Sequence, residues 1–283
     1  MGKRNERNFQ AWKTTGCVRL KLTPVVLFIS LMVPGVFAEG TAYSGAAPGQ
    51  SSRQWLQEDE EQGGDFLFSA PKAFLGFRIG RLFPNTNSEL YDFVMEQLTL
   101  DKEDFRAWDL AVDGGFALNR RVDVVFGAEY AKRSKNSEFR DWVDDNELPI
   151  TQKTYFSQFP MTAGAKILLI PRGRQVGRYA WLPSSFVPYI GGGVGIMWYR
   201  FGQSGDFVDY ETLEIFSADL ESSGWTPTGY LGGGLDIRIA KYTYLTMDVR
   251  YSWARTDLER DYVGFDPLEL SGVRVSAGLQ WHF

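Results

Sequence analysis

The last fourteen residues of the chain, Leu270 to Phe283, alternate between apolar side chains and polar or glycine positions. Successive side chains of an extended strand point to opposite faces, so one face of this stretch is entirely apolar. That face consists of Val273, Val275, Ala277, Leu279, Trp281 and Phe283. Strands of soluble proteins are usually about 5–6 residues long, whereas crossing the hydrocarbon of a bilayer takes roughly 9–11. The pattern favours a membrane-spanning strand, with a long edge strand of a soluble sandwich as the alternative.

The N-terminus has the features of a cleaved signal peptide. Six basic residues between Lys3 and Lys21 precede an apolar run from Val25 to Val36, and small residues end the segment at Ala38. The apolar run is shorter than the roughly 20 residues that a spanning helix needs. We therefore predict a cleaved signal over residues 1–38, the alternative being an uncleaved membrane anchor.

Cleavage after Ala38 would change the chemistry available to the chain. The removed segment contains Cys17, so the mature chain would have no cysteine and no disulfide. It also carries six basic residues and one acidic residue, so the net charge would fall from −5 to −10. Nucleic acid requires clustered positive charge, and we therefore expect no nucleic-acid partner.

Residues 39–71 are rich in small residues and proline and include the acidic run Glu58 to Glu61. Such a composition buries too little apolar surface to order itself. We predict a flexible periplasmic N-terminal segment over 39–71, the alternative being a plug inside the barrel.

The alternation of the C-terminus recurs in seven earlier stretches, which gives eight strands between residues 72 and 283. The stretches begin at Ala73, Trp108, Val122, Phe159, Phe186, Leu231 and Leu245. The glycine-rich stretch 186–201 is ambiguous, and we expect its outward side chains to be Ile190, Val194, Ile196 and Trp198.

The connections between these stretches alternate in length. We expect long loops at 84–104, 132–154, 202–225 and 256–269, short turns at 119–121 and 241–242, and a medium connection at 170–185. Long external loops and short periplasmic turns are typical of outer-membrane barrels. The fold prediction is therefore all-β: a transmembrane antiparallel up-and-down β-barrel of eight strands with long extracellular loops.

Over residues 72–283 the chain resembles the eight-stranded outer-membrane barrels of the OmpA and OmpW kind. The resemblance is carried by PYIGGGVG (Pro188 to Gly195), SQFPMTAGAK (Ser157 to Lys166) and the terminal QWHF. It implies a bacterial outer-membrane location, contact with outer-membrane lipid and lipopolysaccharide, and insertion by the barrel assembly machinery. The membrane-insertion signal would comprise Val275, Leu279, Trp281 and Phe283. The 170–185 connection departs from the pattern because it is too long for a typical periplasmic turn.

Eleven charged residues fall on the face opposite the apolar one. They are Arg78, Asp109, Asp113, Asp123, Glu129, Lys166, Asp236, Arg238, Asp248, Arg250 and Arg274. An eight-stranded barrel is just wide enough for side chains to fill, and isolated buried charges are costly. We expect these acids and bases to pair across the lumen and close it, the alternative being a proton or ion path.

Catalytic and metal chemistry are not expected. The single histidine, His282, would lie at the periplasmic rim, beyond the reach of Ser or Asp side chains on the extracellular loops. One histidine and no mature cysteine argue against a zinc site, so we predict no catalytic residue, metal or cofactor.

The connections hold two further features. Residues 87–104 have helical apolar spacing after Ser88, and residues 205–225 mix acids with large apolar side chains. These loops either pack on each other as a lid or form a recognition surface. Arg172, Arg174, Arg178 and Lys241 either contact periplasmic partners or lipid phosphates, or keep their turns in water.

The sequence thus predicts a non-enzymatic outer-membrane barrel with a structural or surface-interaction role and a mostly closed, salt-bridged lumen. The resemblance to OmpW-like barrels suggests an alternative, a small channel for hydrophobic or small solutes.

Overall fold

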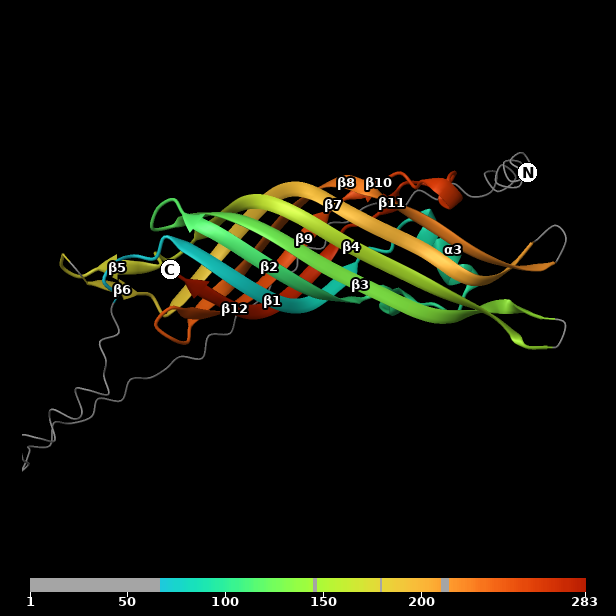
Figure 1. The fold of residues 1–283 in the computed structure, drawn as a ribbon, viewed down its shortest axis with the longest axis horizontal. Helices are drawn as coiled ribbons and strands as arrows, with labels where there is room; N and C mark the ends of the chain where they lie inside the picture. The colour runs from blue at the N-terminus through green and yellow to red at the C-terminus, as the bar shows by residue number, and fades with distance from the viewer. Residues whose placement is uncertain (1–66, 145–146, 179, 210–213) are drawn as a thin grey trace, which may run out of the picture. The chain divides into compact units, whose positions relative to one another are not determined.

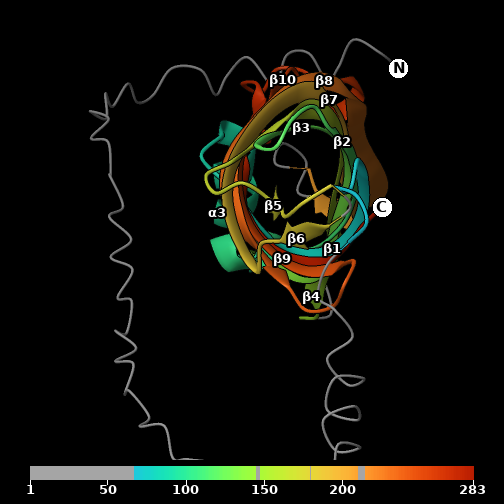
Figure 2. The ribbon, with the colours of Figure 1, turned by 90° about the vertical axis from the view of Figure 1, so that its left-hand side faces the viewer.

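Eight long strands pair in an antiparallel ring, in the order β1-β12-β9-β8-β7-β4-β3-β2, in the computed structural model (Figure 1). The structure describes residues 67–283 except 145–146, 179 and 210–213, so the predicted signal peptide and nearly all of the predicted flexible segment lie outside the described residues. The eight strands are β1 (Ala73–Pro84), β2 (Ala107–Ala117), β3 (Val122–Val143), β4 (Pro149–Leu168), β7 (Phe186–Val208), β8 (Ile215–Arg238), β9 (Thr243–Trp253) and β12 (Gly272–His282). Because β12 pairs with β1, the ring is closed, and the predicted eight-stranded barrel is confirmed (Figure 2).

The strand register places apolar side chains side by side on the outside of the barrel. Leu279 of β12 lies opposite Phe77 of β1 and Leu245 of β9. Phe77 is 50% exposed, whereas its neighbour Arg78 is 6% exposed. Alternation therefore turns apolar residues outward and polar residues inward, as expected when lipid rather than water surrounds the wall.

The ambiguous glycine-rich strand β7 faces the way that was expected. Ile190, Val194 and Ile196 are exposed on the outside, and Trp198 is half-buried. Gly195 faces the interior, where a Cβ atom would lie 1.9 Å from the carbonyl oxygen of Met161. Glycine is required there because the neighbouring backbone leaves no room for a side chain.

Two of the predicted long loops are wrong. Most of 132–154 and 202–225 continues the strands, so β3, β4, β7 and β8 run for 20 to 24 residues. Asn136 pairs with Lys153, and Gln203 with Leu220, well beyond the predicted strand ends. Most outward positions here are polar because they face water, so the apolar alternation that marks a lipid-facing strand stops before the strand does.

The 170–185 connection is a small hairpin rather than a plain turn. Its strands are β5 (Gly173–Gln175) and β6 (Trp181–Pro183). The backbones of Leu67 and Trp181 bond to each other in both directions, and both residues are 2% exposed. In the view along the barrel the hairpin overlies the opening at the end where the short turns lie, called here the short-turn end (Figure 2).

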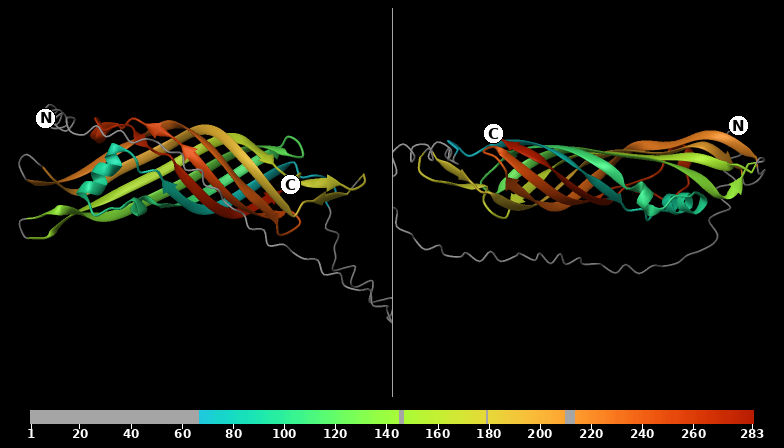
Figure 3. Two further views of the ribbon diagram at one scale, coloured as in Figure 1. Left: turned by 180° about the vertical axis from the view of Figure 1, so that it is seen from behind. Right: turned by 90° about the horizontal axis from the view of Figure 1, so that it is seen from below.

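The opposite mouth is filled by the remaining connections. They contain α3 (Glu89–Gln97), which confirms the helix expected within 87–104, η2 (Lys102–Phe105), β10 (Arg255–Thr256), η3 (Arg260–Tyr262) and β11 (Leu268–Glu269). The helix lies beyond the ends of the short strands and faces the extended parts of the long ones (Figure 3). Within the described residues, no helix has the length and apolar character needed to cross a membrane.

The side chains of these connections and of the strand segments at this mouth form one buried apolar cluster, which is called here the lid. Its largest members include Leu82, Leu90, Tyr91, Phe105, Phe156, Met197, Tyr199, Phe201, Tyr262 and Leu268. Residues 87–104 therefore pack in a lid, which was one of the two arrangements expected for them. Residues 205–225 were expected to behave in the same way, but most of them extend the β7–β8 hairpin and contribute Val208 and Leu220 to the lid.

Candidate functional site

The charged side chains at inward strand positions meet in the lumen. Nine of the eleven expected there are buried: Arg78, Asp109, Asp113, Asp123, Glu129, Lys166, Asp236, Asp248 and Arg274. The Arg250 side chain is 11% exposed. Arg238 differs, because it is only half-buried at the end of β8, next to the short turn.

Arg78 joins carboxylates from three strands. Its Nε atom lies 2.5 Å from Oδ2 of Asp113, and its terminal nitrogens lie 3.0 Å from Asp248 and 3.4 Å from Glu129. It also donates to the hydroxyl of Ser276 over 2.7 Å. A planar guanidinium with five N–H donors suits such a shared position.

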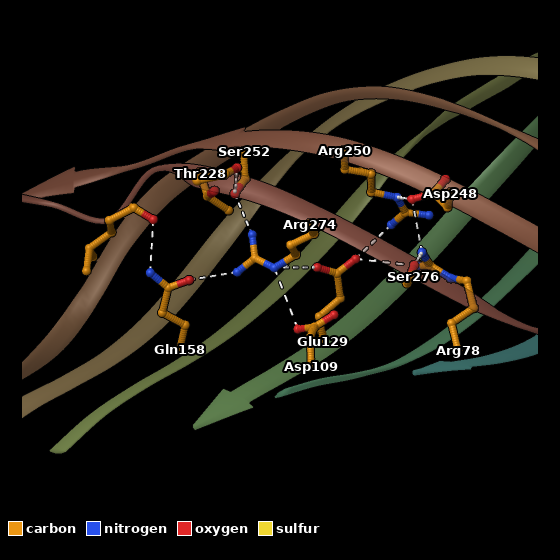
Figure 4. A network of polar contacts seen from close by, with 12 residues as sticks. Arg78, Asp109, Glu129, Gln158, Thr228, Asp248, Arg250, Ser252, Arg274 and Ser276 are labelled. Carbon is orange, nitrogen blue, oxygen red and sulfur yellow. Dashed lines mark hydrogen bonds and ion pairs between the residues drawn. The ribbon is translucent and has the colours of Figure 1, made fainter. Parts of the chain in front are cut away.

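Two further arginines complete this central cluster. Arg250 lies 2.5 Å from Asp248 and 2.8 Å from Glu129. Arg274 lies 3.1 Å from Glu129 and 3.6 Å from Asp109. Glu129 therefore contacts all three guanidinium groups of the cluster (Figure 4).

A second group lies nearer the short-turn end. The ammonium of Lys166 is 2.6 Å from Asp236 and 3.8 Å from the ring centroid of Tyr189. The hydroxyl of Tyr189 donates to Asp248 over 2.7 Å, which links this group to the central cluster. Thr246 donates to the other oxygen of Asp236 over 2.9 Å.

Arg172 is a lumen residue that the sequence did not reveal. It is 7% exposed and forms an ion pair with Asp123. Arg172 belongs to the 170–185 connection, so strand alternation could not place it. One feature of the sequence could have pointed to Arg172. Asp123 was predicted to be a lumen acid at the start of a strand, and the 170–185 connection carries arginines that could pair with it.

The polar lumen ends against the lid. The amide oxygen of Gln158 accepts from Arg274 over 2.7 Å, and its nitrogen donates over 2.9 Å to the carbonyl of Leu270, a member of the lid. A cavity of about 30 Å³ remains among Arg78, Lys166 and neighbouring side chains. Such a volume holds one or two water molecules.

Among the described residues the lumen charges nearly balance: five cations, counting Arg172, face six carboxylates. Buried charges are tolerated when each is paired and hydrogen-bonded, and removing one partner leaves the other as an unpaired buried charge. The arrangement therefore fixes how the strands face each other and fills the barrel interior.

The single histidine of the chain lies inside the short-turn end. His282 is 8% exposed and packs between Phe74 and Tyr244, with ring centroids at 5.7 and 4.4 Å. In the described part of the chain, no group of three or more His, Cys, Asp or Glu side chains is arranged to hold a metal ion.

The residues expected to signal membrane insertion all face outward. Val275, Leu279, Trp281 and Phe283 are 45%, 38%, 39% and 65% exposed. The backbone N–H of Phe283 donates to Ala73, and its carbonyl accepts from Lys72. Phe283 is thus bonded into the seam that closes the barrel.

A closed ring of eight strands, an apolar outer wall and an ion-paired lumen define an eight-stranded transmembrane barrel of the bacterial outer membrane. No family model matches the sequence, and no curated protein matches it. Solved structures with a similar fold include neisserial surface protein A, with 12% identity over 78% of this chain and 98% of that one and a TM-score of 0.41. A major outer membrane protein from Thermus thermophilus has 10% identity, covering 76% and 100%, with a TM-score of 0.44. Ail, the attachment invasion locus protein of Yersinia pestis, has 10% identity, covering 74% and 99%, with a TM-score of 0.40.

Proposed function

We propose that this protein is a non-enzymatic outer-membrane barrel with a mostly closed lumen, which acts through the surface that it presents outside the cell. The observation that carries the proposal is a double block of the barrel. The ion-paired cluster fills the lumen, and the apolar lid fills the mouth above it.

The lid is a packed core rather than a loose set of loops. Tyr91 is fully buried, with its ring centroid 4.9 Å from that of Phe105 and 6.0 Å from that of Phe201. These contacts join η2 and β7 to the helix. Opening the mouth would expose this apolar surface to water, which is unfavourable by about 25 cal/mol per Å².

A surface role is supported by the hairpins β3–β4 and β7–β8, which extend beyond the other strands (Figure 1). Near their tips Val143, Leu148 and Phe216 are 59%, 58% and 48% exposed. Large apolar side chains exposed to water outside the membrane are typical of protein contact sites.

Single-channel recording in planar bilayers tests the closed lumen. We expect the purified wild-type protein to insert without stable ion-conducting steps. Aggregation of bacteria that display the protein tests the surface role, with Phe216→Ser as the variant and Lys153→Ser as a matched change of an exposed polar residue. Stable conductance, or aggregation unaffected by Phe216→Ser, would contradict the proposal.

The alternative function, a small channel for hydrophobic solutes, is supported by a hollow in the outer wall. The pairing of β8 with β9 ends at Gly229 and Trp253. Next to this end of the pairing, on the side of the lid, lies a hollow of about 300 Å³ beside Pro227 and Ser271. In place of ladder bonds, the hydroxyl of Thr228 donates to the carbonyl of Trp253 over 3.2 Å.

Uptake of a hydrophobic fluorescent solute into liposomes distinguishes the two functions. A channel of this kind predicts uptake faster than in protein-free liposomes, and slower uptake in Gly229→Leu, whose side chain would collide with Trp253. The closed-barrel proposal predicts no difference between liposomes with and without the protein.

We further propose that outer-membrane lipid and lipopolysaccharide contact the apolar wall, and that the barrel assembly machinery recognises the terminal strand. The outward set from Val275 to Phe283 supports both. In vivo, Phe283→Ala should lower the amount of folded protein in the outer membrane, whereas His282→Ala, an inward change, should lower it less.

A further inference from the structure

The exposed acidic side chains of the described barrel are confined to one of its two ends. At the short-turn end the exposed charged side chains of the described residues are all basic: Lys72, Arg120, Arg121, Arg174, Arg178 and Lys241. The acidic side chains described at this end are Asp123 and Asp236, and both are buried against Arg172 and Lys166. The face therefore offers positive charge with no exposed acidic side chain among its described residues.

This is not a property of the whole chain, which carries a net charge of −5. The described acidic residues outside the lumen lie at the other end, on α3, η2, the long hairpins and η3, and include Asp92, Glu103, Glu138 and Asp261. That end also carries basic side chains, such as Lys102, Lys153 and Arg255, but the described acids outnumber them, so the net surface charge reverses sign along the barrel axis.

The basic residues at the turns lie next to side chains that face lipid. Arg120 and Arg121 follow Leu118, which is 67% exposed on the outer wall. Their turn is held by Asn119, whose side-chain oxygen accepts the N–H groups of Arg121 over 2.8 Å and Val122 over 2.9 Å. The guanidinium groups are therefore presented at the edge of the apolar wall.

The same placement recurs around the ring. Lys241 precedes Tyr242, which is 46% exposed, and its ammonium lies 5.9 Å from the Tyr242 ring centroid. Lys72 precedes the first strand, and its backbone is bonded to Phe283, itself 65% exposed. An amphipathic ring or an apolar side chain beside a cation is the arrangement found at the level of lipid headgroups.

We propose that the ring of turn cations Lys72, Arg120, Arg121 and Lys241 binds the phosphate groups of anionic phospholipids in the periplasmic leaflet. The short-turn end of outer-membrane barrels faces the periplasm. Arginine forms paired hydrogen bonds to phosphate, and basic residues near an anionic lipid surface are attracted to it. The proposal does not depend on whether the lumen conducts, because these residues lie outside it.

The β5–β6 hairpin gives an internal comparison. Arg174 is exposed on it, while Trp181 is buried and Arg172 is held by Asp123 at its base. The hairpin projects past the strand ends (Figure 1), so Arg174 is set apart from the apolar wall. A lipid partner therefore predicts a larger effect from the turn cations than from Arg174.

The test is co-purification of phospholipid with full-length protein reconstituted in phosphatidylcholine nanodiscs doped with phosphatidylglycerol, quantified by native mass spectrometry. The wild type should retain phosphatidylglycerol over phosphatidylcholine, and the preference should weaken with salt. The triple variant Arg120→Gln/Arg121→Gln/Lys241→Gln should lose about tenfold or more of this preference.

The matched control neutralises three cations at the acidic end, Lys102→Gln/Lys153→Gln/Arg255→Gln, and should keep the preference. Heat-modifiable migration shows that each variant is folded. Equal retention by the wild type and the turn variant would overturn the proposal. So would a loss produced by Arg174→Gln and not by the turn variant, which would place the retained lipid at the β5–β6 hairpin instead of at the turn cations.

Discussion

Arg78 of β1 and Asp113 of β2 face each other inside the barrel, with Nε of the arginine 2.5 Å from Oδ2 of the aspartate and side chains only 4% and 8% exposed. The same guanidinium also reaches Asp248 and Glu129 on strands from elsewhere in the ring. One side chain thus connects β1 with β2, β3 and β9, so contacts inside the lumen help to hold the strands of the barrel together.

Removing this guanidinium should be strongly destabilising. Arg78→Met keeps much of the volume but leaves buried carboxylates without their shared cation, which typically costs about 3–5 kcal/mol. We expect that loss in the free energy of unfolding, measured by urea titration in lipid vesicles. Arg81→Met, on the same strand but facing outward, should change it by less than about 1 kcal/mol.

A double variant separates pairing from packing. Arg78→Met/Asp113→Leu should recover part of the stability lost in Arg78→Met, because one stranded carboxylate is removed along with its partner. A double variant that is as unstable as the sum of its single changes would show that the two side chains do not interact.

Because the outer wall of the barrel is apolar, a charged side chain introduced on it should destabilise the protein more at mid-depth than at the rim. Ile79 lies in the middle of β1 and is 54% exposed on the outside. Ile79→Arg should therefore cost about 2–4 kcal/mol of folding free energy in vesicles, whereas Leu118→Arg at the rim should cost about 0–1 kcal/mol. Equal effects at the two positions would show that Ile79 is not at mid-depth in the bilayer.

Closure of the barrel depends on a close approach between β12 and β1. A Cβ atom at Gly278 would lie 1.9 Å from the carbonyl oxygen of Phe77, whereas at Gly76 the nearest atom would be 3.5 Å away. Gly278→Ala should reduce the fraction that shows heat-modifiable migration, and Gly76→Ala should leave it unchanged. A normally folded Gly278→Ala would show that the seam is looser than described.

The lid should respond to the size of Tyr91 and not to its hydroxyl. Tyr91 is fully buried, its hydroxyl has no hydrogen-bond partner among the described residues, and burial together with nearby Glu269 raises the pKa of the phenol. Tyr91→Phe should therefore be neutral or slightly stabilising, while Tyr91→Ala should lose about 3–5 kcal/mol of unfolding free energy.

Limited proteolysis of the extracellular connections checks this prediction alongside urea titration. The Ala variant should be cleaved faster than the wild type, and the Phe variant at the wild-type rate. Destabilisation by Tyr91→Phe would indicate a bonded hydroxyl, for example to bound water.

The membrane-spanning part of the fold could be predicted from the sequence because lipid imposes a strict alternation. Val249 and Leu279 had to face outward once Asp248 and Gly278 faced inward, and the strand count followed. Of the eleven charged residues that the same rule assigned to the inner face, nine are buried in the structure.

The rule fails where lipid ends. Asn136 and Lys153 pair in a strand that faces water, so no apolar alternation marks it. Arg172 reaches the lumen from a connection, where the direction of a side chain depends on tertiary packing rather than on strand period. The lid was predictable as a set of apolar connections, but its contacts with Phe156 and Phe201 depend on strand extensions that the sequence pattern does not mark.

Spin-label accessibility on β9 and β12 tests two properties at once: whether the outer wall of the barrel lies in lipid, and whether its interior is closed to water. Single cysteines in a Cys17→Ser background would carry the label at Met247 and Val249, which face outward, and at Thr246 and Ser276, which face the lumen. In vesicles we predict that oxygen, which concentrates in lipid, relaxes the labels at 247 and 249, and that a water-soluble nickel chelate reaches none of the four. Access of the chelate to 246 and 276 would show an open pore, and access to 247 and 249 would show that this wall does not lie in the membrane.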